Sequence, residues 1–481
     1  GIGNDFQIQS ISNCFVIESP HDSYAGILHA DQQQVQIMKR RGGVGFDISK
    51  IRPRGQTCEN AARTTDGIEV FMDRFSNSCR EVAQGGRRGA LMLSISVHHP
   101  QVMDFIKIKR DLTRVTGANI SVRVTDHFME AVKKDLKYEQ RWPVDSENPE
   151  IKEDVYAREV WDALIEGAHA SAEPGVLFWD TAKKMTPADI YTDEGFGSTS
   201  TNPCGEIILS PGDSCRLMLV NLTSFVSNPW SPGAVFDWGK YGRTVRKAQR
   251  LMDDMIDLEI EQIDKILTKI ENDPEPDHIK LIEKELWEFI KAQAIRGRRT
   301  GLGITGLGDT VAMLNQIYGS SESIETVEEM YKWLALNSHE ESIILAKERG
   351  AFPICDVKRE QGHPFLERII NELLPERIDD YHTYGRRNIA NTTTAPAGSV
   401  SCLTQTTSGI EPAFMLYYKR RKKINPNDED ASVDFVDDLG DKWTEFTVYH
   451  HGFEQWLNSI HSPDNQDNFT PDELVEASPY N

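Results

Sequence analysis

Short apolar or alternating runs recur along this chain between longer segments of helical periodicity. The runs are SNCFVIE (residues 12–18), GALMLSISV (89–97), ANISVRVT (118–125) and CRLMLVNLTSF (215–225). Apolar residues at every second position are typical of strands, whereas apolar residues three and four apart are typical of helices. Strands that alternate with helices predict an α/β fold around a largely parallel sheet rather than a β-sandwich.

Helical periodicity marks seven segments of the chain. They are residues 28–40, 67–83, 125–135, 155–170, 243–296, 325–348 and 363–374. The longest segment is interrupted by NDPEPD, and because proline cannot continue a helix, this break predicts two helices joined by a turn. No repeat of fixed period is visible.

Length and charge limit the classes of protein to which the chain can belong. A chain of 481 residues can bury a large core, as two or three domains or as one large α/β barrel with insertions. The formal net charge of −22 argues against a broad nucleic-acid-binding surface. No apolar run approaches the roughly 18 residues of a membrane span, and no secretory signal opens the chain. We therefore expect neither a nucleic-acid partner nor a membrane.

The cysteines are few and widely separated. There are seven, at Cys14, Cys58, Cys79, Cys204, Cys215, Cys355 and Cys402. An odd and sparse set does not resemble the framework of a disulfide-rich secreted domain, so a reducing cytoplasm is the predicted location. The chain starts at Gly1 rather than Met and stops after EASPYN, and we interpret it as the interior of a longer polypeptide.

Two of these cysteines, Cys204 and Cys215, lie in the stretch TNPCGEIILSPGDSC. Structural zinc sites usually bring ligands in close pairs such as C-x2-C or H-x3-H, and no such pair occurs here, so no metal site is expected. Two small buried apolar residues would be the ordinary interpretation. However, Cys204 is surrounded by Asn202, Gly205 and Glu206, which suit a functional turn. The spacing alone leaves a structural pair and two separate thiols both open.

A glycine motif occurs in RRTGLGITGLGD, where Gly301, Gly303 and Gly306 satisfy G-x-G-x-x-G. A dinucleotide site needs a strand before this motif and an acidic residue about 20 positions later. What precedes it here is a long charged helix that ends in RGRR. The motif therefore predicts a packing turn that brings a helix and a strand close together.

Two further loops have residues suited to anions. In NTTTAPAGSVS, small residues surround Pro396, and Gly398 and Ser399 offer N–H groups and a hydroxyl that would make a phosphate cradle if a helix starts there. In SCREVAQGGRRGA, two glycines precede Arg87 and Arg88, which could contact an anion or a base edge. The simpler interpretation of NTTTAPAGSVS is an ordinary loop, and that of SCREVAQGGRRGA is a solvated turn.

Seven motifs in a fixed order together resemble the large catalytic chain of ribonucleotide reductase. They are SNCFVIE, RRGGVGFDISKIRPRG, AQGGRRGA, TNPCGEI with Cys215 downstream, GLGITGLGD, PAGSVS and SGIEPAF. The resemblance implies a ten-stranded α/β barrel of two antiparallel half-barrels, with a central finger loop that carries a cysteine. It places this catalytic barrel in residues 1–415, with C-terminal strands that need not all lie within the chain. Residues 416–481, where YYKRRKK gives way to acidic NPNDEDASVDFVDD, are expected to form an acidic peripheral subregion that continues beyond the chain.

The same resemblance assigns chemistry to five residues of one site. Cys204 would form the thiyl radical that takes the 3′-hydrogen of a ribonucleotide. Glu206 would act as the general base for the 3′-hydroxyl, and Asn202 would hold the ribose hydroxyls. Cys14 and Cys215 would be the redox pair that supplies two electrons and ends as a disulfide. The two cysteines of the quoted stretch are then not partners of each other.

Binding residues follow from the resemblance as well. Asn13 and Gly43 match positions that line the substrate. Phosphates of a di- or triphosphate would bind to Pro396, Ala397, Gly398 and Ser399, where the family usually has threonine in place of Ala397. The nucleoside triphosphate effector site and the loop that relays its identity match Asp22, Arg52, Gln84 and Arg88.

The source of the radical distinguishes classes within the family. Phrases such as MLSISVHHP, TGANISVRVTD and TTSGIEPAFMLYYKRRKK favour class II, which uses adenosylcobalamin. The alternative is a class I chain, which receives its radical from a metal-containing small subunit through a tyrosine pair. We interpret Tyr417 and Tyr418 as packing or surface residues rather than that pair. The resemblance also implies a homodimer and an external dithiol reductant such as thioredoxin or glutaredoxin, and any regulatory ATP cone would precede Gly1.

Two other functional hypotheses are compatible with a barrel of this type. One is a non-catalytic homologue that only binds nucleotides, but such a protein would not need Cys14, Cys204 and Cys215 together. The other is a glycyl-radical enzyme, whose glycine motif is not visible here and which fits a dithiol pair less well. The sequence therefore favours a ribonucleotide reductase over both.

Overall fold

The protein is described by a computed structural model that covers residues 8–59, 61, 63–82, 89–424, 432–460 and 469–481. Its contacts divide the chain into two compact units, and each unit is formed by several stretches of sequence. The first unit consists of residues 1–218, 246–302 and 335–395, and the second of residues 219–245, 303–334 and 396–481. Among the described residues, no helix has both the length and the apolar character needed to cross a membrane.

A six-stranded sheet forms the centre of the first unit. Its spatial order is β10 (Ser214–Cys215), β1 (Cys14–Val16), β2 (Gly43–Asp47), β3 (Leu91–Ser96), β4 (Asn119–Val124) and β7 (Gly175–Phe178). The five strands from β1 to β7 run parallel, and β10 pairs antiparallel with β1 at the edge. The predicted α/β class and largely parallel sheet are thus confirmed.

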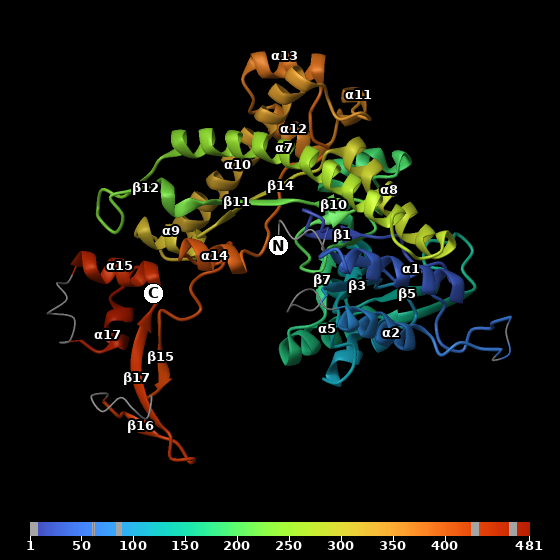
Figure 1. The fold of residues 1–481 in the computed structure, drawn as a ribbon, viewed down its shortest axis with the longest axis horizontal. Coiled ribbons are helices and arrows are strands. Elements are labelled where there is room, and N and C mark those ends of the chain that lie inside the picture. Colours follow the sequence, from blue (N-terminus) through green and yellow to red (C-terminus); the bar gives the residue numbers. More distant parts are fainter. Residues whose placement is uncertain (1–7, 60, 62, 83–88, 425–431, 461–468) are drawn as a thin grey trace. The chain divides into compact units, whose positions relative to one another are not determined.

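Helices connect the parallel strands, as βαβ crossovers require. The connecting helices are α1 (Tyr24–Met38), α2 (Ile68–Glu81), α3 (Val102–Lys107), α4 (Asp126–Lys134) and α5 (Ala157–Ser171). The first unit also contains α6 (Trp179–Met185), α8 (Asp277–Gly297), α11 (Val357–Glu360), α12 (Pro364–Ile370) and α13 (Pro375–Tyr384), which follow the last parallel strand in the chain. The long helices α7 (Trp238–Glu271) and α10 (Ser321–Arg349) each pass from the second unit into the first. Figure 1 shows α1 and α2 beside the sheet.

The core of the first unit lies between this sheet and its helices. All six residues of β3 and all five of β2 are buried, which is typical of parallel strands covered on both faces. Phe15 on β1 packs edge-on against Trp287 on α8, and Phe46 on β2 packs against Phe75 on α2. These apolar contacts fix the sheet edge that bears Cys14.

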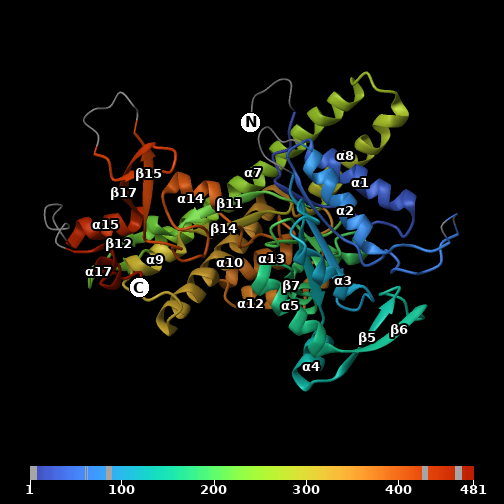
Figure 2. The same cartoon turned by 90° about the horizontal axis from the view of Figure 1, so that it is seen from below.

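Two hairpins extend the first unit beyond its sheet. Strands β5 (Lys137–Trp142) and β6 (Ile151–Tyr156) pair antiparallel, and Figure 2 shows them projecting next to α4. The shorter hairpin joins β8 (Ser200–Thr201) to β9 (Ile208–Leu209). Its base is tied to the sheet, because Ser94 Oγ of β3 lies 2.9 Å from Ser200 Oγ and Arg123 of β4 donates to the Thr199 carbonyl at 3.0 Å.

The second unit has its own antiparallel sheet and a small core. The sheet has the order β15 (Tyr417–Lys423), β17 (Lys442–Tyr449) and β16 (Phe435–Val436), and β12 (Val226–Ser227) pairs with β13 (Val235–Phe236). The helices that lie within this unit are α9 (Leu307–Met313), α14 (Gly398–Thr404), α15 (His451–Ile460) and α17 (Pro471–Glu476). Phe453, Trp456, Leu457 and Leu474 form its core. Strands β11 (Leu217–Asn221) and β14 (Gly301–Thr305) each begin with residues of the first unit and end with residues of the second.

Most predicted elements agree with the structure, and the differences have physical causes. The predicted break at NDPEPD separates α7 from α8, as expected. The helix predicted over residues 363–374 is wrong in its last part, because α12 ends at Ile370 and a new helix starts at Pro375. A residue before proline is disfavoured in the helical conformation, which explains the interruption. Strand β2 had no predicted counterpart because Gly43 and Gly45 weaken its strand pattern.

Acid is expected to destabilise the first unit through His99. This side chain is buried, its Nε2 lies 2.9 Å from the Ile51 carbonyl oxygen, and its Nδ1 accepts from the Gln101 N–H at 3.0 Å. A protonated ring would lose that acceptor, and burial lowers the pKa of His99 to about 4. The unfolded chain therefore binds a proton near pH 6.5 that the folded chain does not bind until about pH 4.

The free energy of unfolding should accordingly fall by up to about 3 kcal/mol as the pH decreases from 6.5 to 4, from this group alone. Denaturant unfolding measured at several pH values tests this. In His99→Asn, the number of protons taken up on unfolding, obtained from the slope of the free energy of unfolding against pH, should fall by up to about one. His382→Asn, at an exposed position, is the control and should leave this slope unchanged. An unchanged dependence in His99→Asn would contradict the assignment.

Candidate active site

Cys14 and Cys215 face each other at the edge of the central sheet. They are register partners of the antiparallel strands β1 and β10, and the Asn13 N–H donates to the Cys215 carbonyl at 3.2 Å. Opposed residues of such strands have Cα atoms about 4.5–5.5 Å apart, within the roughly 4.4–6.8 Å that a disulfide spans. Both cysteines are buried and neither is in a disulfide in this structure. The pair can therefore be oxidised with little movement of the backbone.

Cys204 lies in the turn of the β8–β9 hairpin, where it is exposed. Gly205 follows it with φ of +79°, a left-handed conformation that favours glycine. Asn202 Nδ2 donates to Glu206 Oε2 at 2.5 Å, and its Oδ1 accepts from the Ile207 N–H at 3.3 Å. The turn thus presents a thiol and a carboxylate together, with the amide fixed between the strands.

Electrostatic contacts show that these residues form one site. The pKa of Cys14 is raised to about 12, chiefly by burial, with a hydrogen bond to Asn202 acting in the opposite direction and the charges of Glu206 and Cys204 adding to the rise. Burial and the charges of Cys14 and Glu206 raise the pKa of Cys215. The pKa of Cys204 is also raised, by partial desolvation of its thiol within the otherwise exposed turn and by the charge of Glu206.

The direction of these shifts limits the chemistry of the site. All three thiols keep their hydrogen at neutral pH, whereas a nucleophilic cysteine needs a lowered pKa. Burial also raises the pKa of Glu206, although the Asn202 amide opposes the change. A carboxylate of raised pKa is a stronger base than a free glutamate. The arrangement is thus suited to reactions that transfer hydrogen from thiols beside a general base.

Three glycines allow the strands to approach these residues closely. A Cβ atom on Gly45 would lie 1.8 Å from the Thr201 carbonyl oxygen, and one on Gly43 would lie 2.9 Å from Pro203 Cγ. A Cβ on Gly301 of β14 would lie 2.6 Å from Cys215 Sγ. The predicted packing role of the motif that contains Gly301 agrees with this contact.

The residues predicted to line the substrate lie next to the cysteine pair. Asn13 precedes Cys14 and is exposed, and its carbonyl accepts from the Gly43 N–H at 2.8 Å. Gly43 is the register partner of Cys14 on the other side, in β2. Residues from β1, β2, β10 and the β8–β9 turn therefore meet at this edge of the sheet.

The predicted effector residues fall partly within the described chain. The Nε of Arg52 donates to Asp22 Oδ2 at 2.7 Å, and the Arg52 N–H donates to Asp22 Oδ1 at 2.9 Å. Both residues line a cavity of about 270 Å³ that also contacts Tyr24, Cys58 and Thr65. Gln84 and Arg88 lie outside the described residues.

The predicted phosphate loop belongs to the second unit. Helix α14 begins at Gly398, with Ala397 as its buried N-cap residue, and Pro396 and Ser399 are exposed. The first intrahelical bond runs from the Ser401 N–H to the Ala397 carbonyl at 2.7 Å. The expected helix start is therefore present, although the helix has only seven residues.

Charged residues beside Cys215 had no signal in the sequence. Arg299 Nε donates to Asp213 Oδ2 at 2.6 Å with both side chains buried, and Arg216 Nη1 donates to the Arg299 carbonyl at 3.3 Å. These guanidinium groups oppose the rise in the pKa of Cys215. Arg216 directly follows Cys215, whereas Arg299 lies 83 positions from Arg216, so no local motif could bring the two guanidinium groups together.

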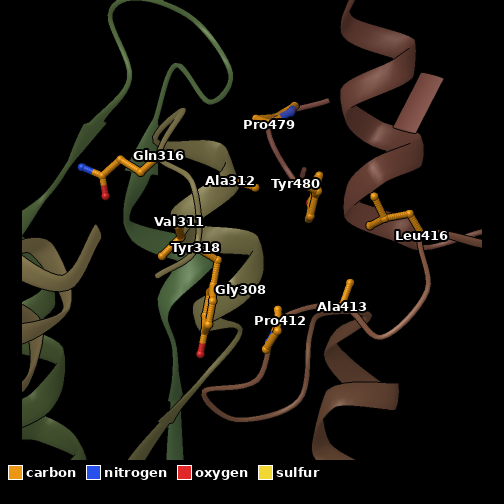
Figure 3. Close-up of a pocket in the computed structure, with 10 residues that line it drawn as sticks. All are labelled: Gly308, Val311, Ala312, Gln316, Tyr318, Pro412, Ala413, Leu416, Pro479 and Tyr480. Carbon is orange, nitrogen blue, oxygen red and sulfur yellow. The ribbon is translucent and has the colours of Figure 1, made fainter. Parts of the chain in front are cut away.

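A small cavity in the second unit is lined by none of the site residues predicted from the sequence. Figure 3 shows Pro479 and Tyr480 across from Val311 and Ala312 of α9. The Tyr480 hydroxyl donates to Asp309 Oδ1 at 2.8 Å, and this carboxylate also contacts His450 Nε2 at 2.7 Å. The cavity therefore lies where Pro479 and Tyr480 pack against α9.

Tyr417 and Tyr418 lie on β15 of the second unit. The Tyr417 hydroxyl donates to Asp472 Oδ1 at 2.5 Å, and Tyr418 is exposed. These positions agree with their interpretation as packing or surface residues.

Comparison with known proteins identifies relatives for most of the chain. A family model described as "Ribonucleotide reductase, barrel domain" matches residues 12–439. A "Vitamin B12-dependent ribonucleoside-diphosphate reductase" of Thermoplasma acidophilum is 32% identical over 422 residues, which cover 86% of this chain and 47% of the relative. A protein of the same description from Mycobacterium tuberculosis is 30% identical over 414 residues, covering 85% of this chain and 51% of the relative.

A more distant relative carries a different description. The "Ribonucleoside-diphosphate reductase large subunit" of Variola virus is 23% identical over 444 residues, covering 85% of this chain and 54% of the relative. The chain thus spans about half the length of the curated relatives it matches. Because the family model covers nearly the whole chain and contains all five residues that meet at the edge of the sheet, this chain belongs to the ribonucleotide reductase barrel-domain family.

Proposed function

We propose that this chain is the catalytic chain of a ribonucleotide reductase, which converts ribonucleotides to 2′-deoxyribonucleotides. The observation that supports this most directly is the meeting of Cys14, Cys215, Cys204, Asn202 and Glu206 at one sheet edge. A protein that only binds nucleotides would not need three thiols beside a carboxylate. The descriptions of the relatives favour ribonucleoside diphosphates over triphosphates as substrates.

Removal of the 2′-hydroxyl is difficult because hydroxide is a poor leaving group, so a radical is first made at C3′. As a thiyl radical, Cys204 takes the 3′-hydrogen: an S–H bond forms and a C–H bond breaks. The two bonds are similar in strength, so the exchange is reversible. Glu206 accepts the proton of the 3′-hydroxyl, and its raised pKa makes it a better base for this step.

Cys14 and Cys215 then supply two electrons and two hydrogens. One thiol protonates the departing 2′-hydroxyl, which leaves as water, and the second hydrogen is transferred to C2′. The two sulfurs join as a disulfide, Glu206 returns its proton to the 3′-oxygen, and Cys204 returns its hydrogen to C3′. An external dithiol such as thioredoxin or glutaredoxin reduces the disulfide for the next turnover.

We propose adenosylcobalamin as the source of the radical, since the relatives from Thermoplasma acidophilum and Mycobacterium tuberculosis are described as vitamin B12-dependent. When bound, this cofactor supplies the radical equivalent that the chemistry requires. Cys204 is an exposed residue of its turn, a position that a bound cofactor could approach. The alternative is a class I chain that depends on a metal-containing small subunit.

Further parts of the proposal concern architecture and regulation. We infer a ten-stranded barrel within residues 1–415, in which the β8–β9 hairpin is the finger loop, and a peripheral subregion in residues 416–481. Asp22 and Arg52, with Gln84 and Arg88, are the proposed effector residues in a cytoplasmic homodimer. Pro396, Ala397, Gly398 and Ser399 are the proposed phosphate-binding residues, and backbone N–H groups of the α14 start support this assignment.

The proposed cofactor can be tested with the full chain. We expect it to form deoxynucleotides from ribonucleoside diphosphates when adenosylcobalamin and a dithiol are supplied, with no partner chain. Omission of cobalamin should abolish product formation. Activity that requires an iron- or manganese-loaded small subunit, and that does not respond to cobalamin, would contradict the class II assignment and leave the chemistry of the site standing.

A further inference from the structure

The turn that carries Cys204 is held from outside by two side chains to which the sequence assigned no role. Asn119, the first residue of β4, donates its Nδ2 hydrogen to the Pro203 carbonyl at 2.8 Å. Thr393 donates its Oγ1 hydrogen to the Glu206 carbonyl at 2.9 Å. The two bonded carbonyls belong to the residue just before Cys204 and to the proposed general base two residues after it.

Hydrogen bonds within the turn fix its shape but not its place in the molecule. The Gly205 N–H donates to the Asn202 carbonyl at 3.0 Å, and the Asn202 amide bonds to Glu206 and Ile207. All of these partners move together if the turn moves. Only contacts with other elements can fix the Cys204 sulfur relative to the Cys14–Cys215 pair.

The base of the hairpin and its tip are anchored in different ways. At the base, the Thr201 carbonyl presses against Gly45, and Ser94 Oγ lies 2.9 Å from Ser200 Oγ. At the tip, Asn119 and Thr393 approach from elements that lie 84 and 187 positions away in the chain. Thr393 is 8% exposed, so a hydrophobic replacement would leave a poorly solvated carbonyl without its donor.

We propose that Asn119 and Thr393 are positioning residues that clamp the Cys204 turn on either side of the reacting sulfur. This inference rests on the proposed function for its catalytic consequence. Catalysis by a positioned group is sensitive to small displacements, and an error of about 1 Å can reduce the rate by roughly 100-fold. Asn119 fixes the position of the Pro203 carbonyl next to Cys204, and Thr393 fixes the position of the Glu206 backbone.

Thr393 offers a matched pair of variants. Thr393→Val keeps the shape of the side chain and removes the donor, whereas Thr393→Ser keeps the hydroxyl. We expect Thr393→Val to lower kcat by about tenfold or more with KM for the nucleotide within about twofold, and Thr393→Ser to recover most of kcat. Equal kcat values for the valine and serine variants would overturn the role of this hydroxyl.

Asn119 is exposed, so the isosteric change Asn119→Asp replaces the donor by an oxygen that repels the Pro203 carbonyl with little risk to folding. We expect a loss in kcat of about the same size, again with little change in KM. Thr116→Val, at an exposed position that lines the same cavity as Asn119, is the control and should retain full activity. A Thr116→Val variant that loses as much kcat as Asn119→Asp would overturn the role of Asn119.

Hydrogen exchange tests the clamp without any turnover. In Thr393→Val and Asn119→Asp, the amides of residues 201–202 and 204–207 should exchange about tenfold faster than in the unchanged chain, while exchange in β2 and β3 stays the same. Faster exchange in a chain that shows no reductase activity would support the clamp and count against the proposed function. Unchanged exchange in both variants would overturn the clamp, whatever the activity.

Discussion

Replacement of Cys204 by serine is expected to abolish turnover, with a loss of at least about 10³-fold in kcat. The O–H bond of serine is too strong for its oxygen radical to exchange hydrogen reversibly with C3′. Because Cys204 is exposed in a turn, the change should leave the fold and nucleotide affinity nearly intact. Deoxynucleotide formation and equilibrium binding of the substrate, measured side by side, provide the test.

A matched control separates radical exchange from a general effect of losing a thiol. Cys355 is a half-buried cysteine of the first unit, next to Gly385 and away from the five proposed catalytic residues. Cys355→Ser should therefore retain most of its activity. Turnover by Cys204→Ser within tenfold of the Cys355→Ser control would contradict the proposed role of Cys204.

The second large effect is expected for the redox pair, and it should differ in kind. Cys215→Ser retains Cys204 and Glu206, so hydrogen abstraction at C3′ can proceed, but the two electrons for reduction are missing. The activated nucleotide should then decompose, releasing its base and a damaged sugar, while deoxynucleotide formation falls by at least about 10³-fold.

Two measurements distinguish this outcome from that of Cys204→Ser. Release of free base should be detectable with Cys215→Ser and absent with Cys204→Ser, and the same contrast should appear for loss of a 3′-tritium label from the substrate. Cys14→Ser should behave like Cys215→Ser, because both sulfurs are needed for one disulfide. If Cys204→Ser and Cys215→Ser lost activity identically, with no base release, the proposed division of roles would be wrong.

The sequence alone predicted the fold class but not the details that position the site. Short apolar or alternating runs identified β1, β3 and β4, because the pattern of each strand lies within one short stretch of the chain. Strand β2 was missed, since Gly43 and Gly45 are poor strand formers that are needed there only because Pro203 and Thr201 lie against them. That requirement comes from tertiary packing and leaves no local pattern.

The candidate site, like the fold, could be predicted only in part from the sequence. The motif TNPCGEI pointed to a functional turn at Cys204, but periodicity and spacing could not pair Cys14 with Cys215. That pairing came from the family resemblance, and the register of β1 and β10 places the two cysteines opposite each other. Asn119, Thr393 and the Arg299–Asp213 pair act through single long-range contacts, which a single sequence does not encode visibly.

The central claim is that Cys14 and Cys215, and not Cys204, provide the reducing electrons, and a single turnover tests it most directly. The chain is reduced, freed of dithiol, and allowed to react once with a ribonucleoside diphosphate and adenosylcobalamin under anaerobic conditions, after which free thiols are alkylated and the peptides are mapped. The proposal predicts one Cys14–Cys215 disulfide for each deoxynucleotide formed, with Cys204 alkylated as a free thiol. A disulfide that contains Cys204 would contradict it. So would product formation after which Cys14 and Cys215 are both recovered as alkylated free thiols.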